Sequence, residues 1–187
     1  MSFTDQPLTP DEGVQALKIA RQSLEASISG ELGETGFLPE HTAGLRQELG
    51  TFVTIHTSDG QLRGCIGHMI GQYPLFSELE SLAVAAGTQD PRFPAVSEEE
   101  LSDLSYEVSV LSTMKETAAK DVIAGTHGLM IKNGVFSGVL LPQVAQERGW
   151  DRVTFLEQTC LKAGLPKDIW QDQNTTILTY TAQVFCE

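Results

Sequence analysis

The sequence lacks a long apolar run. No stretch of its 187 residues approaches the roughly 18 apolar residues of a membrane-spanning helix. The first residues, MSFTDQPLTPDEG, also lack the basic region and apolar run of a signal peptide. We therefore expect a cytoplasmic chain that makes no membrane contact.

Basic residues are few. Lys and Arg number 12 against 25 Asp and Glu, which gives a formal net charge of −13 at pH 7. A surface of this charge repels phosphate backbones and anionic lipid. No run of Lys or Arg is present to build a local basic patch. The composition therefore predicts that nucleic acid is not a partner.

Cysteine pairs and metal-binding motifs are also missing. Cys65, Cys160 and Cys186 are an odd number at wide spacing, which is neither a disulfide framework nor a CxxC motif. Reduced thiols of a cytosolic protein are the simplest interpretation. The four histidines show no HExxH or helical i, i+4 spacing, and no phosphate-binding Walker loop occurs. The sequence thus predicts no metal site within the chain and no cofactor, although a metal shared with a partner stays open.

Helices and antiparallel hairpins are well signalled. Thr9, Pro10 and Glu12 form a capping box that begins a helix ending at Gly30, and Pro74 to Gly87 reads as a second helix. Asp59-Gly60 and Asn133-Gly134 are turn signals of two hairpins. Repeated strand–helix–strand crossovers are missing. We expect an α+β fold, mainly an antiparallel β-sheet with packed helices and a smaller α/β subdomain.

The domain organisation follows from length and from the absence of linkers. We expect one domain over residues 1–187, with two intimately packed subdomains as the alternative. Residues 31–50 are expected to be a connection, and TTILTYTAQVF at 175–185 a closing strand. The sequence does not separate a monomer from a homodimer.

The first hairpin sorts its side chains onto two faces. If Asp59-Gly60 forms the turn, Thr57 pairs with Leu62, His56 with Arg63, Ile55 with Gly64, Thr54 with Cys65, and Val53 with Ile66. Alternation then predicts an apolar face and a polar one. The apolar face has Val53, Ile55, Leu62 and Ile66, and the polar face has Thr54, His56, Arg63 and Cys65.

Cys65 is the leading candidate for chemistry. On the predicted polar face it lies near Arg63, and a nearby cation favours a reactive thiolate. A nucleophile or redox thiol at Cys65, with His56 as its acid or base, is one interpretation. The alternative is a buried packing residue, since cysteine is among the most buried residue types. Arg63 is an anion-binding candidate, unless Glu78, Asp90 or Glu107 already satisfies it.

Four further residues are candidates for ligand binding. Gly64 and Gly67 allow close approach of a ligand or of another backbone. Asp90 and Arg92 lie on a loop stiffened by two prolines, and rigid loops often carry binding residues. The alternative for the loop is a local Asp–Arg pair.

Several ordered motifs resemble the AMME chromosomal region domain family, whose bacterial and archaeal members are called AmmeMemoRadiSam system protein A. They are LRGCIG at 62–67, DPRFPAVSEEEL at 90–101, EVSVL at 107–111, and LLPQVAQERGW with FLEQTCLKAGL further on. The resemblance covers roughly residues 10 to 186. It implies an α+β fold with an antiparallel sheet, and an association with a Memo-like protein and a radical SAM protein. It implies no secure catalytic residue.

Two functions remain open from the sequence. The first is a ligand-handling or thiol-dependent enzyme component with its site around the RGCIG strand. The second is a non-catalytic domain that docks the Memo-like and radical SAM proteins.

Overall fold

The computed structural model describes residues 8–30 and 42–187, so part of the predicted connection over 31–50 lies outside the described residues. The chain divides into two compact units, which are described separately. Unit 1 comprises Met1–Leu111 and Gln183–Glu187, and unit 2 comprises Ser112–Ala182.

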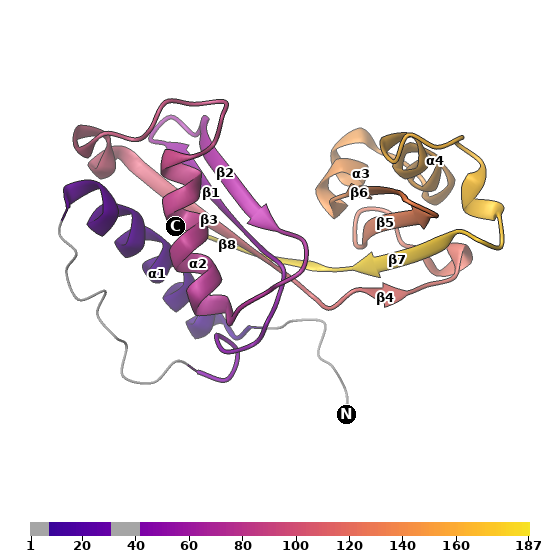
Figure 1. Cartoon of the computed structure of the whole chain (residues 1–187), viewed down its shortest axis with the longest axis horizontal. Helices are drawn as coiled ribbons and strands as arrows, with labels where there is room; N and C mark the ends of the chain where they lie inside the picture. The colour runs from indigo at the N-terminus through magenta and orange to yellow at the C-terminus, as the bar shows by residue number, and fades with distance from the viewer. Residues whose placement is uncertain (1–7, 31–41) are drawn as a thin grey trace. The chain divides into compact units, whose positions relative to one another are not determined.

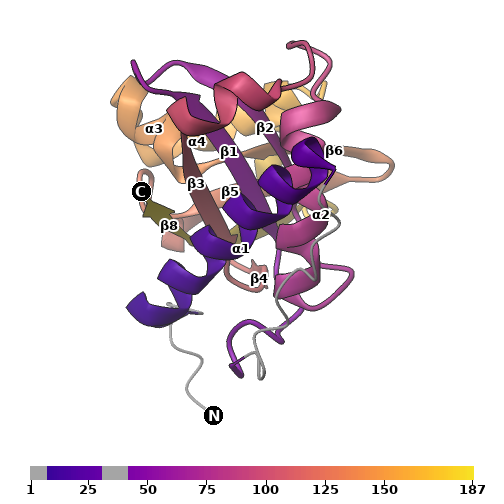
Figure 2. The ribbon, with the colours of Figure 1, turned by 90° about the vertical axis from the view of Figure 1, so that its left-hand side faces the viewer.

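Unit 1 is a four-stranded sheet with helices on one face (Figures 1 and 2). Its strand order is β2-β1-β3-β8, and β1 pairs antiparallel with both β2 and β3. The elements in chain order are α1 (Pro10–Ser29), β1 (Thr51–Thr57), β2 (Leu62–His68), α2 (Leu75–Thr88), the 3-10 helix η1 (Glu98–Asp103), β3 (Leu104–Leu111) and β8 (Ala182–Cys186). The α+β class predicted from the sequence is therefore confirmed.

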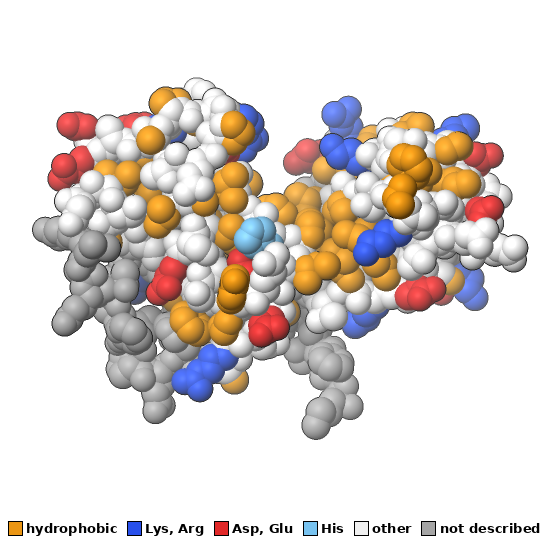
Figure 3. Space-filling model, in the orientation of Figure 1, with side chains coloured by type: hydrophobic (Ala, Val, Ile, Leu, Met, Phe, Trp, Pro, Cys, Tyr) orange, Lys and Arg blue, Asp and Glu red, His pale blue; other side chains and the backbone are white. Residues whose placement is uncertain are grey.

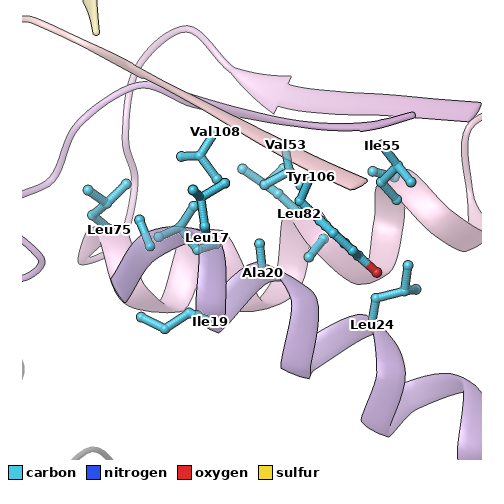
Figure 4. Packing of buried hydrophobic residues seen from close by; sticks show 14 of the residues in the cluster. Leu17, Ile19, Ala20, Leu24, Val53, Ile55, Leu75, Leu82, Tyr106 and Val108 are labelled. Carbon is cyan, nitrogen blue, oxygen red and sulfur yellow. The ribbon is translucent and has the colours of Figure 1, made fainter. Parts of the chain in front are cut away.

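The core of unit 1 lies between the two long helices and the sheet. Figure 4 shows Leu17, Ala20 and Leu24 of α1 among sheet residues that include Val53 and Tyr106. The predicted capping box of α1 is present, because the Thr9 hydroxyl accepts from the Glu12 N–H and the Glu12 carboxylate accepts from the Thr9 N–H.

Gly87 was expected to end α2, but the helix continues to Thr88. A Cβ at Gly87 would lie 2.5 Å from a methyl carbon of Leu24. Gly87 therefore allows close packing of α1 on α2 and does not act as a helix terminator.

Unit 2 contains a second antiparallel sheet, with order β4-β7-β5-β6. Its elements are β4 (Lys115–Glu116), the 3-10 helix η2 (Ala119–Asp121), β5 (Gly128–Asn133), β6 (Phe136–Leu140), α3 (Pro142–Arg148), α4 (Arg152–Lys162), the 3-10 helix η3 (Ile169–Gln171) and β7 (Thr176–Tyr180). The predicted Asn133-Gly134 turn joins β5 to β6, and Gly134 has φ of 58°. Cys160 is fully buried in this core.

The predicted closing strand is split. Residues 175–185 were expected as one strand, whereas β7 ends at Tyr180 in the sheet of unit 2 and β8 starts at Ala182 in the sheet of unit 1. A single polar residue, Thr181, separates them.

No helix among residues 8–30 and 42–187 is long and apolar enough to cross a membrane. On the face of the molecule seen in Figure 3, Lys and Arg side chains are scattered singly and form no continuous basic patch.

Candidate functional site

A β-bulge sets the position of the RGCIG strand. Thr54 pairs with Cys65 and Ile55 with Gly64, as predicted, but the register then shifts and His56 pairs with Leu62. The predicted pairs His56–Arg63 and Thr57–Leu62 are therefore wrong. Arg63 is the extra residue of the bulge, and a bulged residue leaves the ladder and can redirect its side chain. Leu62, expected in the core, is 38 % exposed, whereas Arg63 is buried.

The redirected Arg63 forms a two-pronged ion pair with Glu100 of η1. Its Nε donates to Oε1 at 2.8 Å, its Nη2 to Oε2 at 3.1 Å, and its Nη1 to the Pro94 carbonyl at 2.9 Å. The hydrogen bonds from Arg63 and from the Ser97 N–H lower the pKa of Glu100 to about 2. The carboxylate that satisfies the arginine is therefore Glu100, and not Glu78, Asp90 or Glu107, the three that the sequence analysis considered. The guanidinium that was considered for anion binding is engaged within the protein.

Asp90 and Arg92 hold the backbone of Cys65 along the free edge of β2. An Asp90 carboxylate oxygen accepts from the Cys65 N–H at 2.9 Å, and Arg92 Nη2 lies 3.5 Å from the Cys65 carbonyl oxygen. The two side chains also pair with each other at 2.9 and 2.7 Å. Hydrogen bonds from Arg92 hold the pKa of Asp90 well below its usual value, and the hydrogen bond from the Cys65 N–H lowers it further. Burial acts in the opposite direction but is outweighed. The local Asp–Arg pair, which was one alternative for this loop, is therefore present, and the same two side chains also contact the backbone of Cys65.

Cys65 is a residue of intermediate exposure, and its side chain lies on the sheet face opposite α1 and α2. Since the Cys65 N–H and carbonyl point outward to Asp90 and Arg92, Cys65 and Thr54 form a non-hydrogen-bonded pair, whose side chains approach closely. The Thr54 hydroxyl accordingly donates to Cys65 Sγ at 3.3 Å.

A row of polar side chains continues from Cys65 across this face. Thr54 pairs with Glu107 on β3, and the Cys186 thiol of β8 donates to Glu107 Oε2 at 3.7 Å. Burial and the Glu107 carboxylate raise the pKa of the Cys186 thiol. We name the row Cys65–Thr54–Glu107–Cys186 the thiol row.

His56, the predicted acid or base, stays on this face but pairs with Ser105 and Leu62. The hydrogen bond shown at the Cys65 sulfur comes from Thr54 and not from His56. The bulge lies beyond the Thr54–Cys65 pair, so His56 remains a diagonal neighbour of Cys65 on the same face and its role as acid or base stays a prediction.

The two glycines of RGCIG make room for neighbouring protein atoms. A Cβ at Gly64 would lie 2.1 Å from the Ala86 carbonyl oxygen of α2, so the close approach is that of another backbone. A Cβ at Gly67 would lie 2.2 Å from the ring of Phe52. The space beside each glycine is occupied by atoms of the protein itself.

Sequence reasoning placed Thr54 beside Cys65 but missed Glu100 and Cys186, and it named Glu107 only as a possible partner of Arg63. Glu100 is also the N3 residue of a Ser97 capping box. The places of Glu107 and Cys186 became recognisable through cross-strand register, which requires knowing that β3 and β8 follow β1 in the sheet.

Within the described part of the chain, no group of three His, Cys, Asp or Glu side chains is arranged to hold a metal ion. The histidine His41 lies outside the described residues.

The protein is therefore of the α+β class, with two antiparallel sheets. Its RGCIG strand pairs with β1 on one side and is held by Asp90 and Arg92 on the other. The chain belongs to the AMMECR1 family, whose model matches residues 17–185. This confirms the resemblance carried by the sequence motifs.

Relatives and a solved structure agree with this assignment. Protein NEQ441 of Nanoarchaeum equitans is 40 % identical over 178 residues, which covers 91 % of this chain and 97 % of that protein. A protein of Methanothermobacter thermautotrophicus is 41 % identical over 189 residues, covering 97 % of each. The crystal structure of the uncharacterized protein PH0010 from Pyrococcus horikoshii superposes with a TM-score of 0.76 at 36 % identity, over 97 % of this chain and 94 % of that one.

Proposed function

We propose that this chain is a cytoplasmic thiol-dependent component that handles an anionic ligand and acts with Memo-like and radical SAM proteins. Cys65 is the candidate nucleophile or redox thiol. The observation that carries the proposal is that Asp90 and Arg92 fix the Cys65 backbone while the residue stays partly exposed. Preorganisation of this kind holds a reacting atom in place without blocking access to it.

The neighbours of the sulfur suit such a role. The Thr54 hydroxyl is placed to stabilise negative charge on Cys65 Sγ. The Arg92 side chain is 53 % exposed, so its guanidinium can meet both Asp90 and an anionic group from solution. Asp90 is a positioning residue, because it holds Arg92 and the Cys65 N–H together.

Alkylation by iodoacetamide tests the accessibility of Cys65. In a Cys186→Ser background, Cys65 and Cys160 are the remaining thiols, and Cys160 is fully buried. We expect Cys65 to be labelled in native buffer and Cys160 only in denaturant. An added Arg92→Gln change should slow labelling by an anionic reagent, iodoacetate, more than labelling by neutral iodoacetamide. Native protection of Cys65 equal to that of Cys160, or identical rates for both reagents in both variants, would contradict the proposal.

A docking role is favoured by one separate feature of unit 1. Ile70 and Tyr73 are 63 % and 62 % exposed on the loop after β2. The buried Glu78 holds this loop, since its Oε1 accepts from the Gln72 and Tyr73 N–H groups and its Oε2 contacts His68 Nδ1 at 2.8 Å. Burial opposes the charge, but these hydrogen bonds keep the pKa of Glu78 below its usual value. A rigid loop that exposes two large apolar side chains suits a protein partner.

Light scattering with the purified Memo-like and radical SAM proteins tests docking separately. A complex that Ile70→Ser and Tyr73→Ser weaken, and that Cys65→Ser leaves intact, would support a docking domain. If neither Ile70→Ser nor Tyr73→Ser weakens the complex, this loop is not the docking surface. The same measurement on the chain alone reports whether it forms a homodimer.

A further inference from the structure

The free edge of β2 presents an unpaired backbone N–H and carbonyl at Gly67. The Cys65 N–H and carbonyl point away from β1, and the groups of Gly67, two residues further along, therefore point the same way. The pairing of β1 with β2 is regular from Cys65 to His68, so no bulge interrupts this alternation. Among the described residues, neither group of Gly67 has a hydrogen-bond partner. An unpaired donor and acceptor of this kind are what a sheet edge uses to bind another strand.

The open part of this edge is short. Gly67 is partly exposed, and the side chain of His68 is 45 % exposed. At Cys65, in contrast, the Asp90 and Arg92 side chains already occupy the edge. A strand that pairs with Gly67 cannot continue past Cys65, so the occupant is the end of a chain and not an internal segment.

Arg92 decides which end of a chain fits. Its Nε and Nη2 donate to Asp90, whereas its Nη1 has no hydrogen-bond partner among the described residues. The guanidinium lies beside the Cys65 carbonyl oxygen, 3.5 Å from Nη2. Since β2 runs from Leu62 to His68, an added antiparallel strand brings its C-terminus to this position and a parallel strand its N-terminus. The guanidinium attracts the terminal carboxylate and repels the terminal ammonium.

We propose that the free edge of β2 binds the C-terminal tail of a protein partner, which adds to the sheet as a short antiparallel strand. This inference rests on the anionic ligand of the proposed function and states what that ligand is. The N–H of the last residue of the tail donates to the Gly67 carbonyl, and its carboxylate accepts from the Gly67 N–H and from Arg92 Nη1. Its side chain lies on the same face as the Phe52 ring, which fills the space beside Gly67, so an apolar last residue is favoured.

A short peptide and three matched compounds separate these contributions. The probe is acetyl-Ala-Ala-Val-Leu with a free carboxylate. Its C-terminal amide lacks the charge, and the same peptide with an N-methylated leucine lacks the last N–H. The small acid 4-methylpentanoate has the carboxylate and the leucine skeleton without a peptide main chain, so it tests whether a free organic acid is the ligand instead.

The Gly67 amide signal in nitrogen–proton correlation spectra of the whole chain reports binding directly. We expect the probe peptide at millimolar concentrations to move this signal saturably. The amide should bind about threefold more weakly, because Asp90 already offsets part of the charge of the exposed Arg92. The N-methylated peptide should bind at least about threefold more weakly, because it cannot donate to the Gly67 carbonyl. Binding of 4-methylpentanoate as tight as that of the peptide would overturn the proposal in favour of a small acid.

One variant tests the role of Arg92. Arg92→Gln should weaken the probe peptide by about threefold and leave its amide unchanged, so that the two peptides bind equally. Arg148→Gln, which changes an exposed arginine of α3 in unit 2, is the matched control and should leave both affinities unchanged. The proposal is overturned if the Gly67 signal does not move, if the amide binds the wild type as tightly as the free acid, or if Arg92→Gln weakens both peptides equally.

The alkylation of Cys65 is scored independently of peptide binding. A reactive Cys65 in a chain that binds no peptide overturns this inference and leaves the thiol proposal standing. Peptide binding by a chain whose Cys65 is protected overturns the thiol proposal and supports the C-terminal tail as the ligand.

Discussion

The Arg63–Glu100 pair determines how firmly the RGCIG strand is held, and Glu100→Gln tests it. Glutamine keeps the size of the side chain and can still accept the Ser97 N–H, so the cap of η1 is retained. The charge that Arg63 faces is lost. Because Arg63 is only 8 % exposed, the variant leaves a buried guanidinium without its counter-ion.

The expected loss of stability follows from the pKa of Glu100. Its fall from 4.5 to about 2 corresponds to at most about 3.4 kcal/mol. Since 39 % of the Glu100 side chain is exposed, solvent screening reduces this to about 1.5 kcal/mol. The pKa is lower in the folded state than in the unfolded state. The contribution is therefore fully present above about pH 4.5 and disappears as the pH falls through about 2.

Urea denaturation followed by far-UV circular dichroism measures this difference at pH 7 and in steps down to pH 2. Both tryptophans, Trp150 and Trp170, belong to unit 2, so their fluorescence reports whether that unit unfolds in the same transition. Glu98→Gln, an exposed neighbour on η1, is the matched control and should match the wild type. A Glu100→Gln variant as stable as the wild type at pH 7, or a deficit that stays constant down to pH 2, would refute the reasoning.

Two further substitutions test buried positions in the same denaturation assay. Tyr106→Phe should keep or raise the free energy of unfolding by up to about 1 kcal/mol, because the buried Tyr106 hydroxyl has no hydrogen-bond partner among the described residues. Tyr180→Phe should lower it by about 1 kcal/mol, since that hydroxyl donates to the Leu140 carbonyl, and equal effects of the two changes would contradict both assignments. Gly64→Ala should cost about 2 kcal/mol, because the new methyl group meets the Ala86 carbonyl of α2, and an unchanged unfolding midpoint would show that α2 can move away.

Local signals in the sequence predicted most of the fold. The helix cap at Thr9 and the turn at Asn133-Gly134 depend on hydrogen bonds within a few residues, so they are visible without the tertiary structure. The split of residues 175–185 was not visible, because the apolar alternation continues on both sides of Thr181. Only the sheet order reveals that the two halves join different sheets.

The bulge in the first hairpin marks the limit of register prediction. The Asp59-Gly60 signal correctly placed the turn, but the Thr57 N–H donates to the Gln61 carbonyl, and the Gly60 N–H to the Thr57 carbonyl. This closure leaves one extra residue on β2, and the pattern of side chains does not say where it is placed. In the structure the extra residue is Arg63, which reaches Glu100 from this position.

Four of the five residues of the RGCIG segment have side chains, or lack them, for reasons that the fold explains. Arg63 pairs with Glu100, Gly64 accommodates α2, Ile66 packs against the core, and Gly67 accommodates Phe52. At the remaining position, Cys65, the fold uses the backbone N–H and carbonyl, which any residue other than proline supplies. A thiol is not needed for those bonds, and a packing role would be met by any small side chain. The sulfur of Cys65 is therefore the atom of the segment to which we assign the proposed thiol function.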